Sequence, residues 1–404
     1  MTKPIFPILR FKDFDDELIK FKIGEVSDSY SGGTPSVLNK NFYSGTIPFI
    51  RSAEINKDET ELCINEDALN QSSAKLVEKG DILYALYGAT SGEVGISRID
   101  GAINQAILAI KPYEGYSSEF IMQWLRREKN SIIDKYLQGG QGNLSGGIVK
   151  NLDVQFPTYS EQSSIGTLFQ TLDELLSAYK DNVANYQAFK ASMLSKMFPK
   201  AGQTIPEIRL DGFDGEWDEK KLEELAYYRR GSFPQPYGNK EWYDGANSMP
   251  FVQVVDVLDN FNLSNETKQR ISELAMPKSV FVPTGTILVT LQGSIGRVAI
   301  TKFPCYVDRT ILIIESFKRE MDKYFMAISL KSKFETEKQK APGGTIKTIT
   351  KEVLNDFTIV FPSPEEQRAI GAFFSNLDDL ISNYQDKIKQ LETLKKKLLQ
   401  EMFL

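Results

Sequence analysis

A long internal repeat constrains this chain more than any other feature of its sequence. Residues 156–198 align without a gap with residues 361–403, and 17 of the 43 aligned positions are identical. The identical positions include two pairs that recur in each copy, namely Glu161-Gln162 with Glu366-Gln367 and Met197-Phe198 with Met402-Phe403. A repeat of this length predicts two copies of one structural unit.

The repeat predicts the order domain, long helix, domain, long helix. The expected segments are 1–155, 156–198, 199–360 and 361–404. The two domains match each other far less well than the two helical segments do. The helical part of each unit therefore follows one sequence pattern, while the domain part differs between the two units.

Both aligned segments carry the marks of long helices that pack on each other. Each opens with a capping-box pattern, Thr158–Glu161 and Ser363–Glu366, and Pro364 takes the favoured first helical position. Apolar residues then follow the 3-4 spacing of a coiled coil. Only residues 199–205 separate the first helix from the second domain, a reach of at most ~25 Å. Because this linker cannot return along a helix of ~60 Å, we expect the two helices to be antiparallel.

The two domains are predicted to be mixed α/β. The expected strands are Ile82–Tyr87, Ala106–Ile110, Thr286–Leu291 and Thr310–Ile314. The expected helices are Ser117–Arg127 and Met321–Lys331. The expected fold class is therefore two related α/β domains separated by two long antiparallel coiled-coil helices, with an internal pseudo-two-fold repeat.

The composition is that of a globular protein without a histidine-based active site. The 404 residues are 41% hydrophobic and 25% charged, which is enough for more than one core. The absence of histidine removes the commonest general base and most zinc sites. Cys63 and Cys305 are too few for a disulfide framework and indicate a reducing cytoplasm. No signal peptide and no apolar run of ~18 residues is visible, so we expect no membrane contact.

Signatures of enzymes are weak in this sequence. It contains neither a phosphate loop of the GxxxxGK(S/T) type nor a strand–GxGxxG–helix unit. An acidic and lysine group at Asp218, Glu219 and Lys221 leaves a carboxylate-dependent nuclease open, and the alternative is a solvated turn before a helix at Leu222. The net charge of −6 argues against a non-specific nucleic-acid coat, but not against a reader with its basic groups on one face.

Cationic, amide and aromatic side chains gather in corresponding loops of the two domains. Arg, Lys, Asn and Gln can read base edges or hold phosphates. The candidate DNA-binding residues are Lys40, Asn41, Tyr43, Arg51, Gln138, Gln141 and Asn143 in the first domain, and Arg229, Arg230, Lys240, Trp242, Tyr243, Gln253, Lys338, Lys340 and Lys347 in the second.

Several motifs together resemble one known family. The patterns that carry the resemblance are Gly33-Thr34-Pro35, Gly45–Ile50, Gly88–Ile96 and Asn104–Ile107 in the first domain, and the helix starts Phe156-Pro157 and Phe361-Pro362. Over nearly its whole length the chain is similar to the DNA specificity (S) subunit of Type I restriction–modification systems. The second domain departs from the pattern, with Gly231–Pro234 in place of Gly-Thr-Pro and Asp308-Arg309 in place of Asn104-Gln105.

The resemblance implies a subunit without catalytic activity that recognises a bipartite, asymmetric target in double-stranded DNA, one half-site per domain. Two modification subunits would supply adenine methylation that depends on S-adenosylmethionine. Restriction subunits would supply translocation and cleavage that depend on ATP and magnesium, so no cofactor and no metal is expected in this chain. The alternative left open is a coiled-coil scaffold that binds proteins and not DNA.

A second apolar stripe widens the seam of both helices. The residues that form it are Leu176, Val183 and Leu194 in the first helix and Ile381, Ile388 and Leu399 in the second. A wide apolar face suits a four-helix arrangement. We therefore expect a free face there that receives helices of the modification subunits, and the alternative is that these side chains rest on the chain's own domains.

Overall fold

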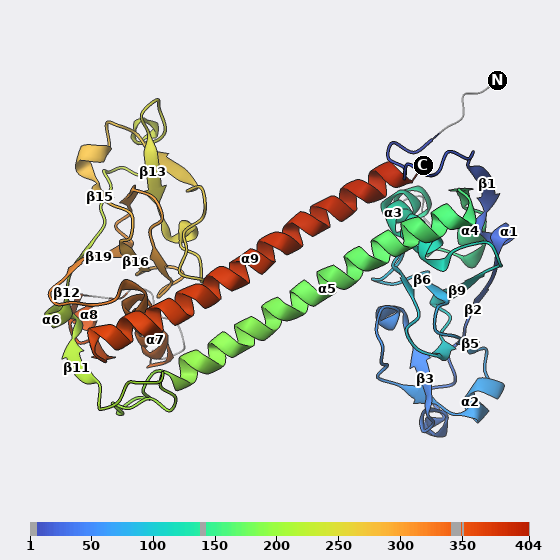
Figure 1. The fold of residues 1–404 in the computed structure, drawn as a ribbon, viewed down its shortest axis with the longest axis horizontal. Coiled ribbons are helices and arrows are strands. Elements are labelled where there is room, and N and C mark those ends of the chain that lie inside the picture. Colours follow the sequence, from blue (N-terminus) through green and yellow to red (C-terminus); the bar gives the residue numbers. More distant parts are fainter. Residues whose placement is uncertain (1–5, 138–142, 341–348, 350, 404) are drawn as a thin grey trace. The chain divides into compact units, whose positions relative to one another are not determined.

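The structure is a computed structural model that describes residues 6–137, 143–340, 349 and 351–403 (Figure 1). It divides into unit 1, Met1–Asp181 with Gln385–Leu404, and unit 2, Asn182–Tyr384. The long helix α5 (Tyr159–Lys196) begins in unit 1 and ends in unit 2, whereas α9 (Pro364–Met402) begins in unit 2 and ends in unit 1. Each unit therefore holds the start of one long helix and the end of the other.

The described part of unit 1 folds into two four-stranded sheets, with strand orders β2-β9-β6-β7 and β4-β3-β8-β5, and a two-stranded sheet of β1 and β10. Strand β3 runs parallel to β8, and the other pairs are antiparallel. The elements before α5 are β1 (Ile19–Lys22), α1 (Ile23–Val26), β2 (Ser27–Ser31), η1 (Lys40–Tyr43), β3 (Ile47–Ile50), η2 (Ser52–Glu54), β4 (Cys63–Ile64), α2 (Glu66–Asn70), β5 (Lys75–Val77), β6 (Ile82–Ala85), β7 (Val94–Ile96), β8 (Gly101–Ile103), β9 (Ile107–Pro112), α3 (Ser118–Tyr136), α4 (Gly146–Lys150) and β10 (Asp153–Phe156).

Unit 2 repeats this plan with sheets β12-β19-β16-β17, β14-β13-β18-β15 and β11-β20. The repeat seen in the helices thus extends through both domains, as expected. The elements between the long helices are β11 (Asp218–Lys221), α6 (Leu222–Leu225), β12 (Ala226–Arg230), η3 (Lys240–Trp242), β13 (Met249–Val252), η4 (Val254–Asp256), β14 (Gln269–Ile271), η5 (Met276–Lys278), β15 (Val280–Val282), β16 (Ile287–Thr290), β17 (Val298–Ile300), β18 (Cys305–Val307), β19 (Ile311–Phe317), α7 (Lys323–Lys340), α8 (Lys351–Asn355) and β20 (Thr358–Phe361).

The strands and domain helices expected from sequence are confirmed, with shifted boundaries. Each of the four strand segments overlaps a strand. Both helical segments overlap longer helices, α3 and α7, which begin one and two residues later than expected. The segment around Asp218, Glu219 and Lys221 is different, because it forms strand β11 and not the expected turn. Side chains alternate along a strand, and the Lys221 ammonium lies 3.2 Å from the Asp356 carboxylate. The three groups therefore do not converge as a nuclease site would require.

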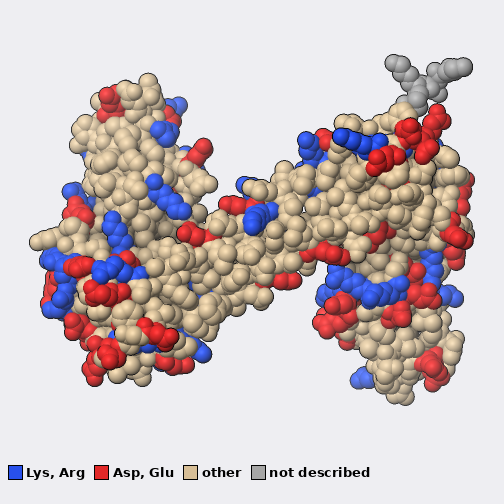
Figure 2. All heavy atoms as spheres, viewed as in Figure 1, with Lys and Arg blue, Asp and Glu red and all other residues tan. Residues whose placement is uncertain are grey.

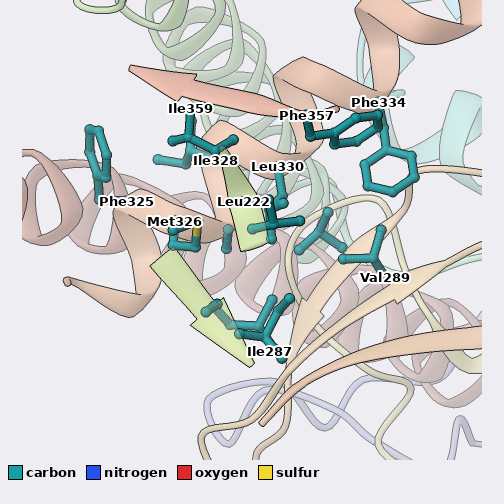
Figure 3. Packing of buried hydrophobic residues seen from close by; sticks show 14 of the residues in the cluster. Leu222, Ile287, Val289, Phe325, Met326, Ile328, Leu330, Phe334, Phe357 and Ile359 are labelled. Atoms are coloured by element: carbon teal, nitrogen blue, oxygen red, sulfur yellow. The ribbon is translucent and has the colours of Figure 1, made fainter. Parts of the chain in front are cut away.

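Alternation along the central strands divides each core into two layers. In β16, Ile287 and Val289 belong to the same cluster as the buried face of α7, while Leu288 packs with residues of the other four-stranded sheet. Figure 3 shows Ile287 and Val289 in one cluster with side chains that α7 contributes, among them Phe325 and Ile328. Strands β6 and β9 of unit 1 divide their side chains in the same way.

The repeated Met-Phe pair at the end of each long helix completes the core of a unit. The Phe403 ring lies 5.1 Å from the Phe120 ring in unit 1, and the Phe198 ring lies 5.4 Å from the Phe325 ring in unit 2. The preceding methionines are also buried. This shared packing explains why the pair recurs in a chain whose two domains have diverged.

The two long helices are antiparallel where they pair within a unit. In unit 2, the Tyr186 ring stacks on the Tyr384 ring at 5.8 Å, and the Lys190 ammonium lies 2.5 Å from the Asp378 carboxylate. Moving forward along α5 thus corresponds to moving backward along α9. The antiparallel arrangement predicted from the short linker is confirmed.

One carboxylate in each unit joins the helix pair to the domain. Asp173 of α5 binds Lys395 of α9 and also Arg126 of α3, whose guanidinium lies 2.9 Å away. Asp378, the equivalent residue in unit 2, accepts a hydrogen bond from Tyr324 of α7 in addition to its bond from α5. Burial opposes ionisation of Asp173, but the neighbouring cations hold its pKa below the ordinary value.

A second pair of contacts fixes the start of each long helix. The Arg10 guanidinium binds the Glu161 carboxylate through two bonds of 2.7 and 2.6 Å, and Arg209 binds Glu366 through bonds of 2.8 and 2.6 Å. Both carboxylates are buried. We call these two contacts the arginine latches. Each connects the segment that precedes a domain to the helix that follows it.

The latches correct one expectation about the helix starts. Glu161 and Glu366 were expected to close capping boxes by binding the backbone at the cap, but both carboxylates are occupied by arginine. The other half of the second box is present, because the Ser363 hydroxyl accepts the Glu366 amide at 3.4 Å. Pro364 is the first residue of α9, as expected.

We predict that Arg10→Ala lowers the free energy of unfolding of unit 1 by ~3–5 kcal/mol, because it leaves the Glu161 carboxylate buried without its cation. The double variant Arg10→Met with Glu161→Leu should recover much of this loss, since neither charge remains. Denaturant unfolding followed by hydrogen exchange of unit 1 peptides measures both effects. Equal stability of Arg10→Ala and the wild type would show that the latch is dispensable.

Candidate nucleic-acid interface

The loop that follows the first strand of the β2 and β12 sheets has the same framework in both units. In unit 1 the Asn39 amide donates to the Ser36 carbonyl at 3.2 Å, and in unit 2 the Asn239 amide donates to the Pro236 carbonyl at 3.1 Å. Each asparagine then caps a short 3-10 helix, η1 or η3, through its side-chain oxygen. We call residues 36–39 and 236–239 the loop turns.

A close backbone approach holds each loop in place. A Cβ atom at Gly32 would lie 1.9 Å from the Ile103 carbonyl oxygen, and one at Gly231 would lie 2.2 Å from the Val307 carbonyl oxygen. Only glycine fits at such distances. Strands β8 and β18 therefore support the two loops at equivalent points.

Three of the candidate DNA-binding residues lie exposed directly after the loop turns. Lys40 and Asn41 of η1 are exposed in unit 1, and Lys240 of η3 is exposed in unit 2. Their side chains are open to solvent at the same place in each unit. These positions agree with the sequence interpretation of a polar surface.

The aromatic candidates in these loops are structural, which corrects the sequence interpretation. Trp242 is only 9% exposed and packs against Phe251, with the Lys278 ammonium 4.8 Å from its ring centre. The Tyr43 hydroxyl donates to the Pro35 carbonyl at 2.8 Å, and the Tyr243 hydroxyl makes the equivalent bond to its own loop. These rings are held by packing and by hydrogen bonds to the loop backbone, so they are not free to stack on bases.

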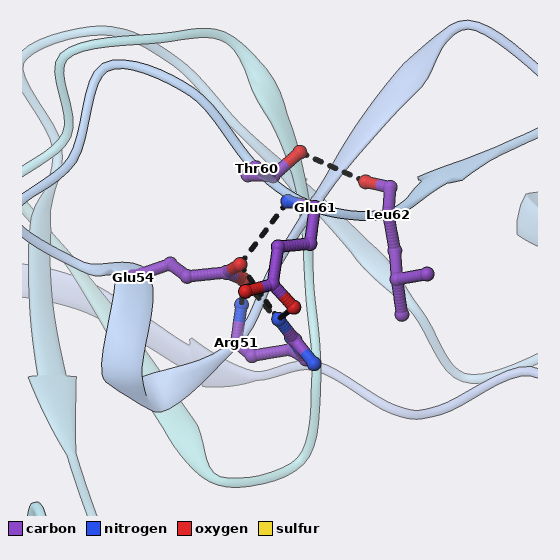
Figure 4. A network of polar contacts seen from close by, with 5 residues as sticks. All are labelled: Arg51, Glu54, Thr60, Glu61 and Leu62. Carbon is purple, nitrogen blue, oxygen red and sulfur yellow. Dashed lines mark hydrogen bonds and ion pairs between the residues drawn. The ribbon is translucent and has the colours of Figure 1, made fainter.

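Arg51 is committed to an ion-pair network (Figure 4). Its guanidinium lies 2.8 Å from the Glu54 carboxylate and 2.5 Å from the Glu61 carboxylate. Burial works against ionisation of Glu54, but its bonds from Arg51 and from the backbone amides of Arg51 and Glu61 lower its pKa to about 2. With both carboxylates at hand, Arg51 does not present a free positive charge to DNA.

Unit 2 keeps the carboxylate of this network but not the cation. Asp256 accepts the Gln253 and Lys268 amides, both at 2.8 Å, just as Glu54 accepts two amides in unit 1. Gln253 stands where unit 1 has Arg51, and burial without a close cation raises the pKa of Asp256. The two units thus share a backbone arrangement and differ in its charge.

The remaining candidates are dispersed. Asn143 is exposed before α4, Arg229 is exposed on β12, and Arg230 donates to the Ile349 carbonyl at 2.7 Å. Gln138, Gln141 and Lys347 lie outside the described residues, as do the side chains of Lys338 and Lys340. Among the candidates that the structure describes, only those around the loop turns lie together.

Two functional candidates were missed in the sequence. Gln105 accepts the Thr34 hydroxyl at the base of the first loop, and Arg309 lies with its guanidinium 5.0 Å from the Tyr237 ring centre in the second. Both are exposed and occupy equivalent positions. The alignment of Gln105 with Arg309 in the sequence could have revealed them, because glutamine and arginine read different bases.

The prediction of a free apolar face on the long helices is wrong for Leu176 and Ile381. Leu176 and Ile381 are each only 7% exposed within the folded chain, so neither presents a free apolar side chain. The other members of the stripe are half-buried, namely Val183, Leu194, Ile388 and Leu399. Phe189 and Leu394 follow the apolar 3-4 spacing of the two helices, but they are 45% and 44% exposed.

Figure 2 shows acidic and basic side chains mixed over the visible face of each unit, in keeping with the negative net charge. Within the described ranges, no cluster of three or more Asp, Glu or Cys side chains could hold a metal ion. No helix among these residues is both long enough and apolar enough to cross a membrane.

Two α/β units of one plan, built on an antiparallel helix pair, define the class of protein. A family model for the type I restriction modification DNA specificity domain matches residues 16–210 and 214–393. The chain therefore belongs to this family and carries two copies of its domain.

Relatives and solved structures agree with the family. The chain is 25% identical over 300 residues to a putative type I restriction enzyme MjaX specificity subunit of Methanocaldococcus jannaschii, covering 72% of this chain and 67% of that one. It is 22% identical over 396 residues to the MjaVIII specificity subunit of the same organism, covering 94% and 90%. The crystal structure of a type I S subunit from M. genitalium has the same fold, with a TM-score of 0.65, 14% identity and 99% of both chains covered. A chain of another type I R-M system gives a TM-score of 0.52 at 16% identity, with 96% and 98% covered.

We predict that Glu54→Gln lowers the stability of the loop in unit 1 by ~1–3 kcal/mol at neutral pH, because it weakens bonds from Arg51 and two amides. The folded-state pKa of Glu54 is below its ordinary value of 4.5, so its contribution is present above that pH and is lost as the pH falls towards 2. Hydrogen exchange of residues 51–61 measures this dependence.

Asp256→Asn is the matched control in unit 2. The pKa of Asp256 is raised, so its ionised form stabilises the fold less, and the substitution should cost less at neutral pH. An acid response of residues 51–61 that is unchanged in Glu54→Gln would contradict the assignment to Glu54.

Proposed function

We propose that this chain reads a bipartite, asymmetric DNA sequence as the specificity subunit of a type I restriction–modification complex, with one half-site for each unit. The observation that carries this proposal is a common loop framework with different tips. Both units keep the glycine, the turn and the asparagine cap, while the exposed residues around them differ. Two readers built on one scaffold suit two different half-sites.

The non-catalytic role follows from the family, whose matched relatives are specificity subunits. We propose that methylation with S-adenosylmethionine, and translocation and cleavage with ATP and magnesium, belong to separate modification and restriction subunits. A protein-binding scaffold without DNA contact fits less well, because the family is defined by DNA specificity. The nuclease alternative is not supported by the placement of its residues on β11.

A domain exchange tests independent reading. We predict that replacing residues 27–150 by the equivalent segment of a relative changes one half-site alone. This segment runs from β2 to α4, so the exchange leaves the β1–β10 pairing and the Arg10 latch intact. Sequencing of methylated sites in cells that express the complex identifies the new target.

Exchange of residues 226–355 is the matched control and should change only the other half-site. A change in both halves after either exchange would contradict independent reading. Loss of all methylation by a complex that still assembles would count against the chosen boundaries, and repeating the exchange from β1 to β10 would then decide.

We also propose that the exposed apolar residues of the long helices receive two modification subunits. Phe189 and Leu394 occupy equivalent positions of the aligned helices and are exposed to nearly the same degree. A large apolar side chain kept exposed at both positions fits one partner type that binds twice. They replace Leu176 and Ile381 as the expected centre of this contact.

We predict that Phe189→Asp together with Leu394→Asp weakens assembly with the modification subunit at least tenfold, because two apolar contacts are replaced by charges. Light scattering of the mixed subunits measures the mass of the complex. Ala188→Asp with Thr393→Asp adds the same charge at exposed neighbouring positions and should leave assembly unchanged. An intact complex with the first pair would rule out this contact.

A further inference from the structure

The loop turn of unit 1 carries two large apolar residues at its tip. The turn closes between Ser36 and Asn39, so Val37 and Leu38 are its two central residues. Val37 is 71% exposed and Leu38 is 93% exposed. Such tips are usually Gly, Asn, Asp, Ser or Pro. Since Leu38 buries almost no surface, it adds little to the stability of the fold.

The support beneath this tip is well fixed. The Tyr43 hydroxyl binds the Pro35 carbonyl at 2.8 Å, directly before the turn. The Asn39 side chain accepts the Asn41 amide at 3.2 Å, directly after it. The Thr34 hydroxyl binds Gln105, which ties the loop to the end of β8. Val37 and Leu38 are therefore presented to solvent on a held backbone.

The loop turn of unit 2 has the same backbone bond and a different tip. Tyr237 and Gly238 are its central residues, and the Tyr237 hydroxyl donates to the buried Asp308 carboxylate at 2.6 Å. The ring is thus folded back, and the guanidinium of exposed Arg309 lies 5.0 Å from its centre. Unit 2 presents a cation beside the turn where unit 1 presents an apolar tip.

This difference distinguishes between two kinds of partner. A protein that binds both units in the same way would meet the same chemistry in each. A tip that is apolar in one unit and cationic in the other fits a partner whose two parts differ, as the half-sites of an asymmetric target do. The exposed Lys40 and Asn41 beside the apolar tip provide donors for phosphates or base edges.

We propose that Val37 and Leu38 contact a thymine methyl group in the major groove of the half-site that unit 1 reads, and that Arg309, beside the loop turn of unit 2, contacts a guanine of the other half-site. The thymine methyl is the apolar group that bases present in this groove, and guanine presents two acceptors that suit arginine. This inference rests on the proposed function, since it assigns bases to loops of a DNA reader.

Deoxyuridine tests the methyl contact, because it differs from thymidine only in lacking that methyl group. Duplexes are prepared with the target sequence that methylation sequencing identifies. Each thymine of the unit 1 half-site is then replaced in turn by deoxyuridine, on either strand. The full chain in complex with its modification subunit should bind one of these duplexes about fourfold more weakly, as expected for one unburied methyl group. The double variant Val37→Ser with Leu38→Ser should bind that duplex and its thymine parent equally.

Arg309→Gln is the matched control. It should keep the deoxyuridine effect in the unit 1 half-site and lose discrimination at a G·C pair of the other half-site. Thermal unfolding of the serine variant should match that of the wild type, because both replaced side chains are exposed.

Three results would overturn the proposal: no deoxyuridine effect in the wild type, an undiminished effect in the serine variant, or a unit 1 half-site without thymine on either strand. In each of these the complex still binds its target, so the proposed function stands. A complex that binds no specific duplex would overturn both.

Discussion

The arginine latch is the contact on which the architecture of each unit depends. It binds the segment before a domain to the first turn of the helix that follows the domain, and it does so with a buried carboxylate that accepts two bonds. The antiparallel pairs β1–β10 and β11–β20 also bring the entry and exit of each domain together. A domain closed at its base in this way can change its distal loops without disturbing the long helices.

The comparison of the two units separates what supports the fold from what varies. Asp173 and Asp378, the glycines under the loops and the Met-Phe ends recur in both, and each has a packing or bonding role that does not depend on DNA sequence. The charge around Glu54 and Asp256 and the residues at the loop turns do not recur. The two units thus differ at the exposed tips of the loop turns and in one buried polar network, while the framework that holds them is the same.

The sequence predicted the parts of this structure that depend on local or repeated signals. Heptad spacing and the ungapped repeat were enough for the long helices, and the short linker was enough for their antiparallel pairing. β-branched runs were enough for the central strands. It did not predict that Glu161 would bind Arg10, that Trp242 would lie beneath its loop, or that Leu176 would be covered. Each of these depends on segments that meet only after folding. The loop tips were overlooked because two apolar residues in a turn resemble an ordinary hydrophobic pair until their exposure is known.

The exchange of helix ends between the units has a consequence for the order in which the chain folds during synthesis. Unit 2 is one continuous stretch, Asn182–Tyr384, and its core includes Phe198 from its own beginning. Unit 1 is interrupted, and Phe403 must reach Phe120 and Phe169 before its core is filled. On the ribosome the domain made first is therefore the one completed last, and its core stays open until the end of α9 has been made.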